Sequence, residues 1–140
     1  MQLDTHELAW AAGFFDGEGT TRVDWQLTPA THGRRRVYGP YAHLWVSVGQ
    51  YDRDCLGRFQ CAVGGLGKIY KNHKHRSGRC YSFQTGKFET SQAIIAMIWQ
   101  WLSIPKRQQA AAALNEMREY HRRPDGRKGV VHCGDGERGL

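Results

Sequence analysis

Two carboxylates, Asp16 and Glu18, stand in the stretch Asp-Gly-Glu-Gly at the end of an apolar segment. The two glycines permit a sharp exit from a helix and leave backbone carbonyls open beside the acids. Carboxylate and carbonyl oxygens are the ligands that hard divalent cations prefer. The stretch therefore indicates a cation site, and an ordinary acidic turn after a helix is the simpler alternative.

The segment Leu8 to Phe15, which leads into these acids, lacks proline and β-branched residues, so a helix is predicted here. Ala9, Gly13 and Gly17 are four residues apart, so one face of this helix carries nothing larger than a methyl group. Each glycine lowers the stability of a helix by roughly 1 kcal/mol relative to alanine. Its presence here indicates that another backbone must approach this face closely. We expect a second helix against this face.

The eight residues Ala12-Gly-Phe-Phe-Asp-Gly-Glu-Gly19 resemble the signature of the LAGLIDADG homing endonucleases. Ala11 stands where the first leucine is usual, and Glu18 stands at the final acid, which is Asp or Glu. The resemblance implies that the signature helices of two halves pack against each other at the centre of the protein. It also implies that Glu18 helps to bind the metal that cuts DNA, with the Gly17 carbonyl as a further ligand.

The resemblance extends to two more positions. Gln50, which closes the second predicted strand, matches the polar residue that positions water, and Lys106 matches the basic residue that polarises water or stabilises the phosphate. It implies the catalytic set Glu18, Gln50 and Lys106, with Mg²⁺ as the metal and Ca²⁺ or Mn²⁺ as substitutes for binding or cleavage.

Each of these positions also has a simpler interpretation. Gln50 stands equally well at a helix start, and Lys106 competes with its neighbour Arg107. The family often uses another basic residue after the second strand, where this sequence offers only Arg53. Asp16 is interpreted as a structural support of the helix end.

One signature in 140 residues amounts to half an active site, so the resemblance implies the homodimeric branch of the family. We expect a Mg²⁺-dependent endonuclease that makes a double-strand break in a long, near-palindromic DNA target. The alternative is a nuclease-inactive relative that binds DNA as a regulator or intron RNA as a maturase. The joint presence of Glu18, Gln50 and Lys106 favours the enzyme.

Basic residues are unevenly distributed along the chain, whose formal net charge is +7. No acid occurs between Asp24 and Asp52 or between Asp54 and Glu89, and Lys, Arg and His are frequent in both windows. Such asymmetry is typical of a surface that faces a polyanion, and a solvated basic face without a partner is the alternative. Because an antiparallel ribbon fits the major groove, the DNA-binding candidates by placement are Arg22, Asp24, Gln26, Arg34, Arg36, His43, Lys68, Tyr70, Lys71, His73, Lys74, Arg76 and Gln84.

Alternating side chains indicate two hairpins with basic tips. The first joins strands over Thr20–Thr28 and Val37–Gly49, and the second joins Lys68–Lys71 to Cys80–Thr85. By the resemblance to the LAGLIDADG homing endonucleases, the four strands are expected to form an antiparallel sheet that binds DNA.

Helices are predicted between and after the hairpins. One is capped by Asp52 and runs to Val63, one covers Lys87–Leu102 with apolar residues at spacings of three and four, and a terminal one covers about Lys106–His121. The order α-β-β-α-β-β-α with a C-terminal helix, in the mixed α+β class, resembles the LAGLIDADG homing endonuclease fold.

Residues 1–122 are expected to form a single domain, and the residues after them, rich in Gly and charge, a flexible tail over 123–140. No apolar run of about 18 residues and no signal-peptide pattern occurs, so we expect no membrane partner and an intracellular protein in the cytoplasm, the nucleoid or an organelle matrix.

The cysteines and tryptophans are interpreted as structural. None of the four cysteines forms a Cys-x-x-Cys pair, so free thiols are preferred over a disulfide framework. A zinc ion held by His73, His75 and Cys80 is the alternative, although the spacing fits no standard finger. The tryptophans interpreted as core residues are Trp25, Trp45, Trp99 and Trp101.

Overall fold

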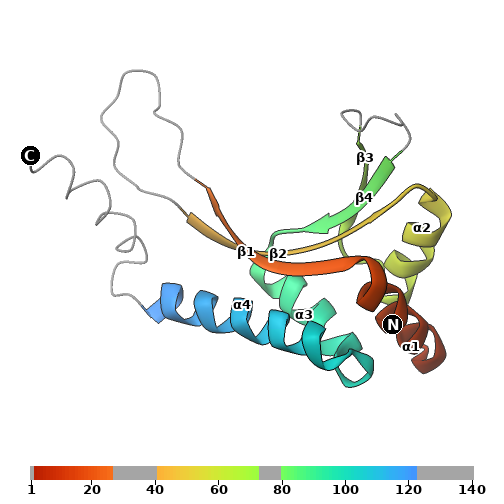
Figure 1. Cartoon of the computed structure of the whole chain (residues 1–140). Coiled ribbons are helices and arrows are strands. Elements are labelled where there is room, and N and C mark those ends of the chain that lie inside the picture. The colour runs from red at the N-terminus through yellow and green to blue at the C-terminus, as the bar shows by residue number, and fades with distance from the viewer. Residues whose placement is uncertain (1, 27–40, 73–79, 123–140) are drawn as a thin grey trace, which may run out of the picture.

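The computed structural model describes residues 2–26, 41–72 and 80–122, and these ranges fold around one antiparallel sheet with the strand order β1-β2-β4-β3. Figure 1 shows the helices gathered on one side of the twisted sheet, with α4 running beneath β1 and β2. The predicted element order is confirmed. The elements are α1 (Thr5–Glu18), β1 (Gly19–Gln26), β2 (Tyr41–Gln50), α2 (Arg53–Ala62), β3 (Lys68–Asn72), β4 (Cys80–Thr85), α3 (Phe88–Ile98), the 3-10 helix η1 (Trp99–Trp101) and α4 (Ile104–Arg122).

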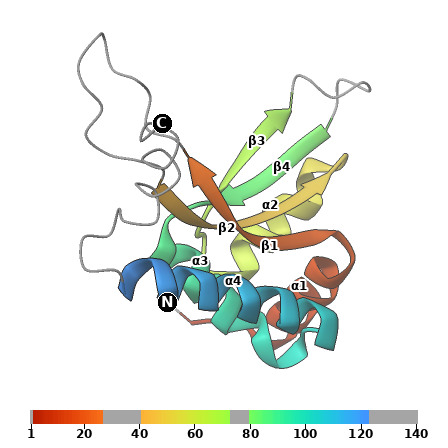
Figure 2. The ribbon, with the colours of Figure 1, turned by 60° about the vertical axis from the view of Figure 1, so that its left-hand side comes forward.

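The two faces of the sheet differ in what covers them. Along β2, Leu44, Val46 and Val48 are fully buried and alternate with the half-buried His43 and Trp45. Because successive side chains of a strand point to opposite faces, the apolar row lies against the helices and the other row lies on the uncovered side. We call this uncovered side the open face, and Figures 1 and 2 show that no described helix lies over it.

Three phenylalanines from α1, α2 and β4 form the centre of the core. The ring centroids of Phe15 and Phe59 are 6.2 Å apart, and those of Phe59 and Phe83 are 5.0 Å apart. Gly67, with φ of +80°, lets the chain turn into β3 against this cluster, because a Cβ there would come within 2.3 Å of the Phe83 ring. The end of α1 is thereby fixed relative to the sheet.

Beyond the end of β4, the sheet narrows to the two strands β1 and β2. Thr85, the last residue of β4, pairs with Val46, so the β2 residues before Val46 have no partner in β4. The buried Ser91 hydroxyl donates to the carbonyls of Leu44, at 2.6 Å, and Thr85, at 3.2 Å. A side chain of α3 therefore satisfies backbone acceptors at the point where the third strand stops.

The structure extends two of the predicted helices. α1 runs from Thr5 to Glu18, so both signature acids are helical, and its N-cap Asp4 accepts hydrogen bonds from the N–H groups of His6 and Glu7. α4 starts at Ile104, two residues earlier than predicted, because a proline is tolerated in the first turn of a helix, where its missing N–H has no intrahelical partner. The predicted hairpin tips within residues 27–40 and 73–79 and the tail 123–140 lie outside the described residues.

Two tryptophans are not core residues, contrary to the sequence interpretation. Trp25 is 41% exposed, because α4 covers it only at the edge, where its Nε1 donates to Glu116 at 2.8 Å and its ring meets Tyr120. Trp45 is half-buried and lies on the open face, because β2 alternates in the other phase. In the described ranges, no helix is long and apolar enough to cross a membrane.

Candidate active site

Glu18 ends α1 as an exposed carboxylate. It has no hydrogen-bond or ion-pair partner among the described residues. As the last residue of α1, Glu18 lies at the negative end of the helix dipole, where an acid costs about 0.3–1 kcal/mol. No basic residue in the last turn offsets this cost. A carboxylate in this unfavourable and unpaired position is available to a cation.

Lys106 reaches the backbone at the C-terminal end of α1. Its ammonium group donates a hydrogen bond to the carbonyl of Gly19, the residue after Glu18, and lies 6.0 Å from the centre of the Phe15 ring. The neighbouring Arg107 points elsewhere, with Nε donating to the Trp99 carbonyl at 3.0 Å and the guanidinium to the Gln100 carbonyl at 2.8 Å. The structure thus distinguishes the two candidates, because only the lysine reaches the end of α1.

Asp16 connects the end of α1 to the start of α4. Its carboxylate accepts hydrogen bonds from the N–H of Ser103, at 3.0 and 3.1 Å, and from the Ser103 hydroxyl, at 3.0 Å. Ser103 immediately precedes α4, and Lys106 lies in the first turn of that helix. Asp16 therefore fixes the lysine relative to Glu18, in agreement with the structural role expected from the sequence.

Gln50 lies at the same end of the sheet. The register pairs Gly19 with Val48, and Gln50 follows two residues later, where β2 passes the end of α1. Its side-chain oxygen accepts the N–H of Tyr51 at 2.8 Å, which holds the amide group against the backbone. Arg53, the further basic candidate, is the exposed first residue of α2.

The oxygen donors of one chain suit a hard cation but do not complete a metal site. Glu18 contributes a carboxylate, and Gly17, in the last turn of α1, contributes a carbonyl of the kind that a helix end leaves without an intrahelical partner. Mg²⁺ accepts such ligands and completes its shell with waters and phosphate oxygens. Within the described part of the chain, no group of three or more His, Cys, Asp and Glu residues could hold a metal ion. A complete metal site would therefore need ligands beyond those of the described residues.

No described residue covers the small-residue face of α1. Gly13 and Gly17 are exposed, and a Cβ added to either would meet nothing within 4 Å, while Ala9 is half-buried. The opposite side of α1 faces the core with Leu8 and Phe15. The stripe that was predicted to receive a second helix is therefore free to do so.

Arg58 of α2 binds two residues in the first half of α1, Glu7 and Trp10. Its guanidinium makes a bidentate ion pair with Glu7, at 2.8 and 2.9 Å, and lies 3.9 Å from the centre of the Trp10 ring. Trp10 in turn stacks on Phe14 with ring centroids 5.1 Å apart. These contacts attach the first half of α1 to α2.

The strand register decides which DNA-binding candidates share the open face. Cross-strand pairs place Arg22 beside Trp45, Asp24 beside His43, Lys68 beside Gln84 and Tyr70 beside Ser82, all on this face. Gln26 is the last residue of β1, opposite Tyr41. Thr20, Ser47 and Ser82 lie on the open face too and were missed, because their small hydroxyl side chains give no signal until the register is known.

Lys71 is not brought to the open face. It pairs with Tyr81 and shares the helix-covered face with Ile69, since it is one residue out of phase with Tyr70. The candidates that lie outside the described residues are Arg34, Arg36, His73, Lys74 and Arg76.

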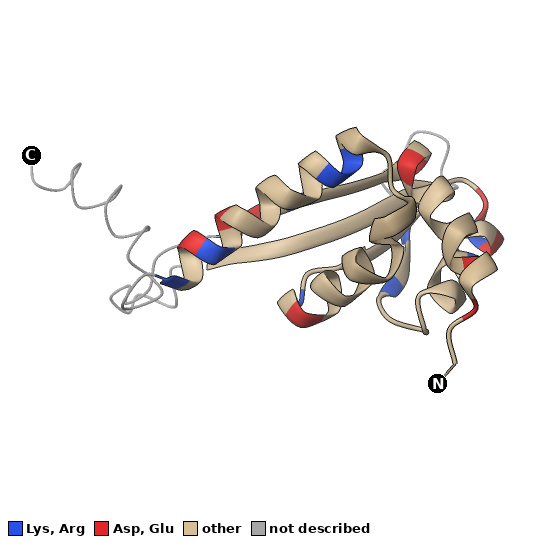
Figure 3. Ribbon diagram, turned by 90° about the horizontal axis from the view of Figure 1, so that it is seen from below, with Lys and Arg blue, Asp and Glu red and all other residues tan. Residues whose placement is uncertain are grey.

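Charge is divided sharply along the chain. The described ranges contain ten Lys and Arg and ten Asp and Glu, so the net charge of +7 comes entirely from the other segments. Segments 27–40 and 73–79, which connect β1 to β2 and β3 to β4, each add three basic residues and no acid. Figure 3, which views the molecule from the helix side, shows both signs interspersed over the helices. The excess of positive charge therefore belongs to the two strand connections and the tail.

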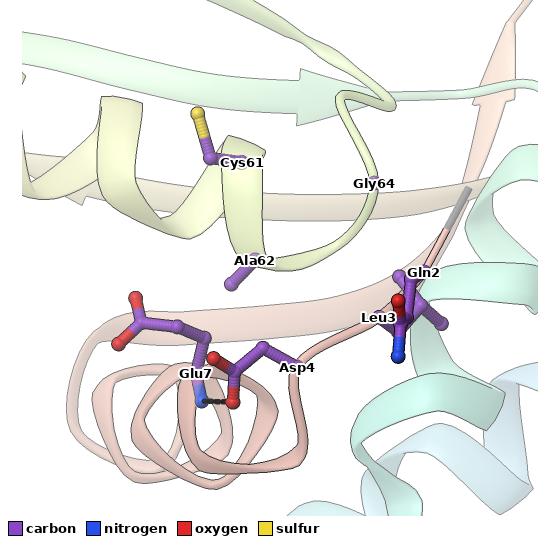
Figure 4. Close-up of a pocket in the computed structure, with 7 residues that line it drawn as sticks. All are labelled: Gln2, Leu3, Asp4, Glu7, Cys61, Ala62 and Gly64. Carbon is purple, nitrogen blue, oxygen red and sulfur yellow. Dashed lines mark hydrogen bonds between the residues drawn. The ribbon is translucent and has the colours of Figure 1, made fainter.

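A shallow pocket lies at the opposite end of α1 from Glu18 (Figure 4). Its lining residues are Gln2, Leu3, Asp4, Glu7, Cys61, Ala62 and Gly64. Since a helix rises 1.5 Å per residue, the pocket is roughly 20 Å from Glu18. The hydrogen bond between the Asp4 carboxylate and the Glu7 N–H belongs to the helix cap, so the pocket is separate from the candidate active site.

No family model and no curated protein matches this chain, but solved structures do. The homing endonuclease I-CvuI in complex with its target is 21% identical, with a TM-score of 0.63 over 79% of this chain and 65% of that one. The archaeal intron-encoded homing endonuclease I-Vdi141I, complexed with DNA, is 19% identical, with a TM-score of 0.64 over 91% of this chain and 79% of that one. The I-LtrWI LAGLIDADG homing endonuclease bound to target DNA is 19% identical, with a TM-score of 0.62 over 88% and 42%.

The fold of this chain is that of the LAGLIDADG homing endonucleases, which confirms the fold predicted from the sequence. The chain spans 65% of the length of the I-CvuI chain and 42% of the I-LtrWI chain. The latter therefore has room for two units of this size.

Proposed function

We propose that this chain is a single-signature LAGLIDADG homing endonuclease that acts as a homodimer and makes a double-strand break in a long, near-palindromic DNA target. The observation that carries the proposal is the arrangement at the end of α1. Glu18 has no partner among the described residues, and the Lys106 ammonium is bound to the carbonyl of the next residue, Gly19. Glu18 also adjoins a helix face that no described residue covers.

A second copy of the chain would complete the site. In a two-fold symmetric dimer, the same surface of each subunit meets itself, so packing α1 on α1 brings the two Glu18 residues near the axis. A palindromic target mirrors this symmetry. I-CvuI and I-Vdi141I, which share the fold, were solved as complexes with DNA.

Each residue at the end of α1 has a part in phosphodiester hydrolysis. Glu18 and the Gly17 carbonyl would hold Mg²⁺, which when bound activates water and neutralises phosphate charge. The Lys106 ammonium adds positive charge where the phosphate oxygens become more negative. The Gln50 amide, held at the neighbouring strand end, orients the attacking water.

The open face would lie in the major groove. A two-stranded antiparallel ribbon fits that groove, and side chains on it can reach base edges. The basic residues of segments 27–40 and 73–79 would attract the phosphate backbone and make affinity fall steeply with salt. A DNA substrate assigns the protein to a compartment that contains DNA, namely the cytoplasm, the nucleoid or an organelle matrix.

The test is cleavage of a plasmid library with random inserts, read by sequencing the new DNA ends. The wild type should produce ends at one near-palindromic site in Mg²⁺ and none in EDTA. Glu18→Gln keeps the size of the side chain but removes an anionic ligand, so cutting should fall by about a hundredfold or more. Glu119→Gln, a matched exposed acid on α4, should cut like the wild type.

Binding in Ca²⁺ separates the alternatives. Glu18→Gln should retain the duplex that the wild type selects, because the open face is unchanged. If Glu18→Gln cuts at the wild-type rate, Glu18 is not the metal ligand. If the wild type binds a duplex tightly but never cuts it, the chain is a nuclease-inactive DNA-binding protein.

A further inference from the structure

We propose that Arg22 reads one guanine in each half of the DNA target and that Trp45 is the positioning residue that holds its guanidinium over the base edges. This inference rests on the proposed function, in which the open face lies in the major groove. It assigns a role to Trp45, a residue for which the sequence predicted only a place in the core.

Arg22 is an available cation on the open face. It lies on β1 directly opposite Trp45 of β2, is exposed, and has its Cζ 5.8 Å from the centre of the Trp45 ring. In the described ranges, no carboxylate is within ion-pair distance of it, in contrast to Arg58, which pairs with Glu7. The donors of the Arg22 guanidinium are therefore not used by the described part of the fold.

Trp45 provides a fixed support for this arginine. The indole rests against the backbone of Gly86, where a Cβ would lie 2.9 Å from the ring atoms Cε3 and Cζ3. The indole is thus partly buried in the sheet, and only glycine at position 86 leaves room for the ring. An arginine over an aromatic face is attracted by the ring and loses less freedom when it binds a ligand.

The direction in which Arg22 leans favours a base over a phosphate. β1 is an edge strand, so an arginine directed outward from it would meet the DNA backbone. Arg22 leans inward over β2, toward the middle of the ribbon that faces the groove floor. There the planar fork of an arginine matches O6 and N7 of guanine, the commonest specific contact in the major groove.

The strand also fixes the position of the base. Arg22 is three residues after Gly19, the first residue of β1, and Gly19 directly follows Glu18. With a strand rise of about 3.3 Å per residue and up to about 3.8 Å for the step from Glu18 to Gly19, the Cα atoms of Glu18 and Arg22 are at most roughly 14 Å apart. With about 3.4 Å between successive nucleotides of one strand, this distance corresponds to about four base pairs. The guanine should therefore lie about four base pairs from each cut.

The experiment selects duplexes from a randomised DNA library with the full chain in Ca²⁺ and sequences the bound pool. The wild type and Arg118→Gln, a matched exposed arginine on α4, should enrich a guanine at two symmetric positions. Arg22→Gln should lose this preference by about tenfold at those positions only, with a shift toward adenine. Trp45→Leu should lose it to a similar extent although Arg22 is present, and Trp45→Phe should restore it.

The outcomes separate this inference from the proposed function. If the wild type enriches no duplex, the DNA-binding function fails and the inference fails with it. If it enriches a site whose preferences are the same in Arg22→Gln, or if that variant weakens binding equally for all sequences, Arg22 is at most a phosphate contact and the inference alone is wrong. Thermal unfolding shows whether Trp45→Leu is folded. If it is not, Arg22→Gln, a substitution at an exposed residue, still tests whether Arg22 reads the guanine.

Discussion

Asp16 joins two elements that are remote in sequence, so its removal tests whether α4 is held in place from the end of α1. Asp16→Ala removes one charge-assisted hydrogen bond from the Ser103 N–H and one from its hydroxyl. A hydrogen bond to a charged group contributes about 1.5–3 kcal/mol, and the contact is half-buried, so the lower values apply. We expect a loss of about 3 kcal/mol in the free energy of unfolding, or about 10 °C in Tm.

The assay is equilibrium unfolding in urea of the wild type, Asp16→Ala, Ser103→Ala and the double variant. Ser103→Ala keeps the N–H bond and loses only the hydroxyl bond, so it should cost about 1.5 kcal/mol. The two changes share that bond, and the double-mutant cycle should give a coupling free energy of about 1.5 kcal/mol at an unchanged m-value.

A neighbouring acid provides the control. Glu18 has no partner among the described residues, so Glu18→Gln should unfold no more easily than the wild type and should gain about 0.3–1 kcal/mol from relief at the helix end. The reasoning is refuted if Asp16→Ala loses less than about 1 kcal/mol, or if the two losses are strictly additive in the cycle.

Two further predictions concern α1. The hydrogen bonds from Arg58 lower the pKa of the Glu7 carboxylate below its ordinary value of 4.5. The ion pair therefore stabilises the fold fully above pH 4.5, and this contribution is lost as the pH falls through the lowered pKa. The difference in unfolding free energy between the wild type and Arg58→Met should therefore shrink in acid, and a difference that is constant with pH would contradict the pairing. Gly13→Leu should give a folded monomer in sedimentation, because the leucine side chain meets no described atom of its own chain but blocks the approach of a second α1. The control is Gly57→Leu on α2, a helical glycine that also faces open space, and this variant should stay dimeric. A Gly13→Leu dimer of wild-type affinity would exclude this interface.

Local signals explain what the sequence predicted well. Asp4 and Asp52 both cap the helices that follow them, because a cap needs only the next two or three residues. The alternation in β2 likewise appears in the sequence, since the buried and open rows differ in residue type. Element order follows from such signals, and the fold was predicted from that order together with the resemblance to the LAGLIDADG signature.

Contacts between distant residues could not be predicted in this way. The pairing of Asp16 with Ser103 spans 87 residues, and nothing in either neighbourhood indicates the other. The choice between Lys106 and Arg107 depends on how α4 is rotated against β1, and the exclusion of Lys71 from the open face depends on the register between β3 and β4. Each is a property of packing between elements and not of any one of them.

The contacts between α4 and β1 also limit how this molecule can aggregate. β1 is an edge strand, and side chains of α4 already bind two of its backbone groups: the Gly19 carbonyl accepts from Lys106, and the Thr21 N–H donates to Gln109 at 3.1 Å. An incoming strand would have to displace a helix to pair there. The other edge is the five-residue β3, whose lysines repel a second copy of themselves. A folded chain with one sheet edge partly covered and the other short and charged can be held at high concentration without polymerising through its strands.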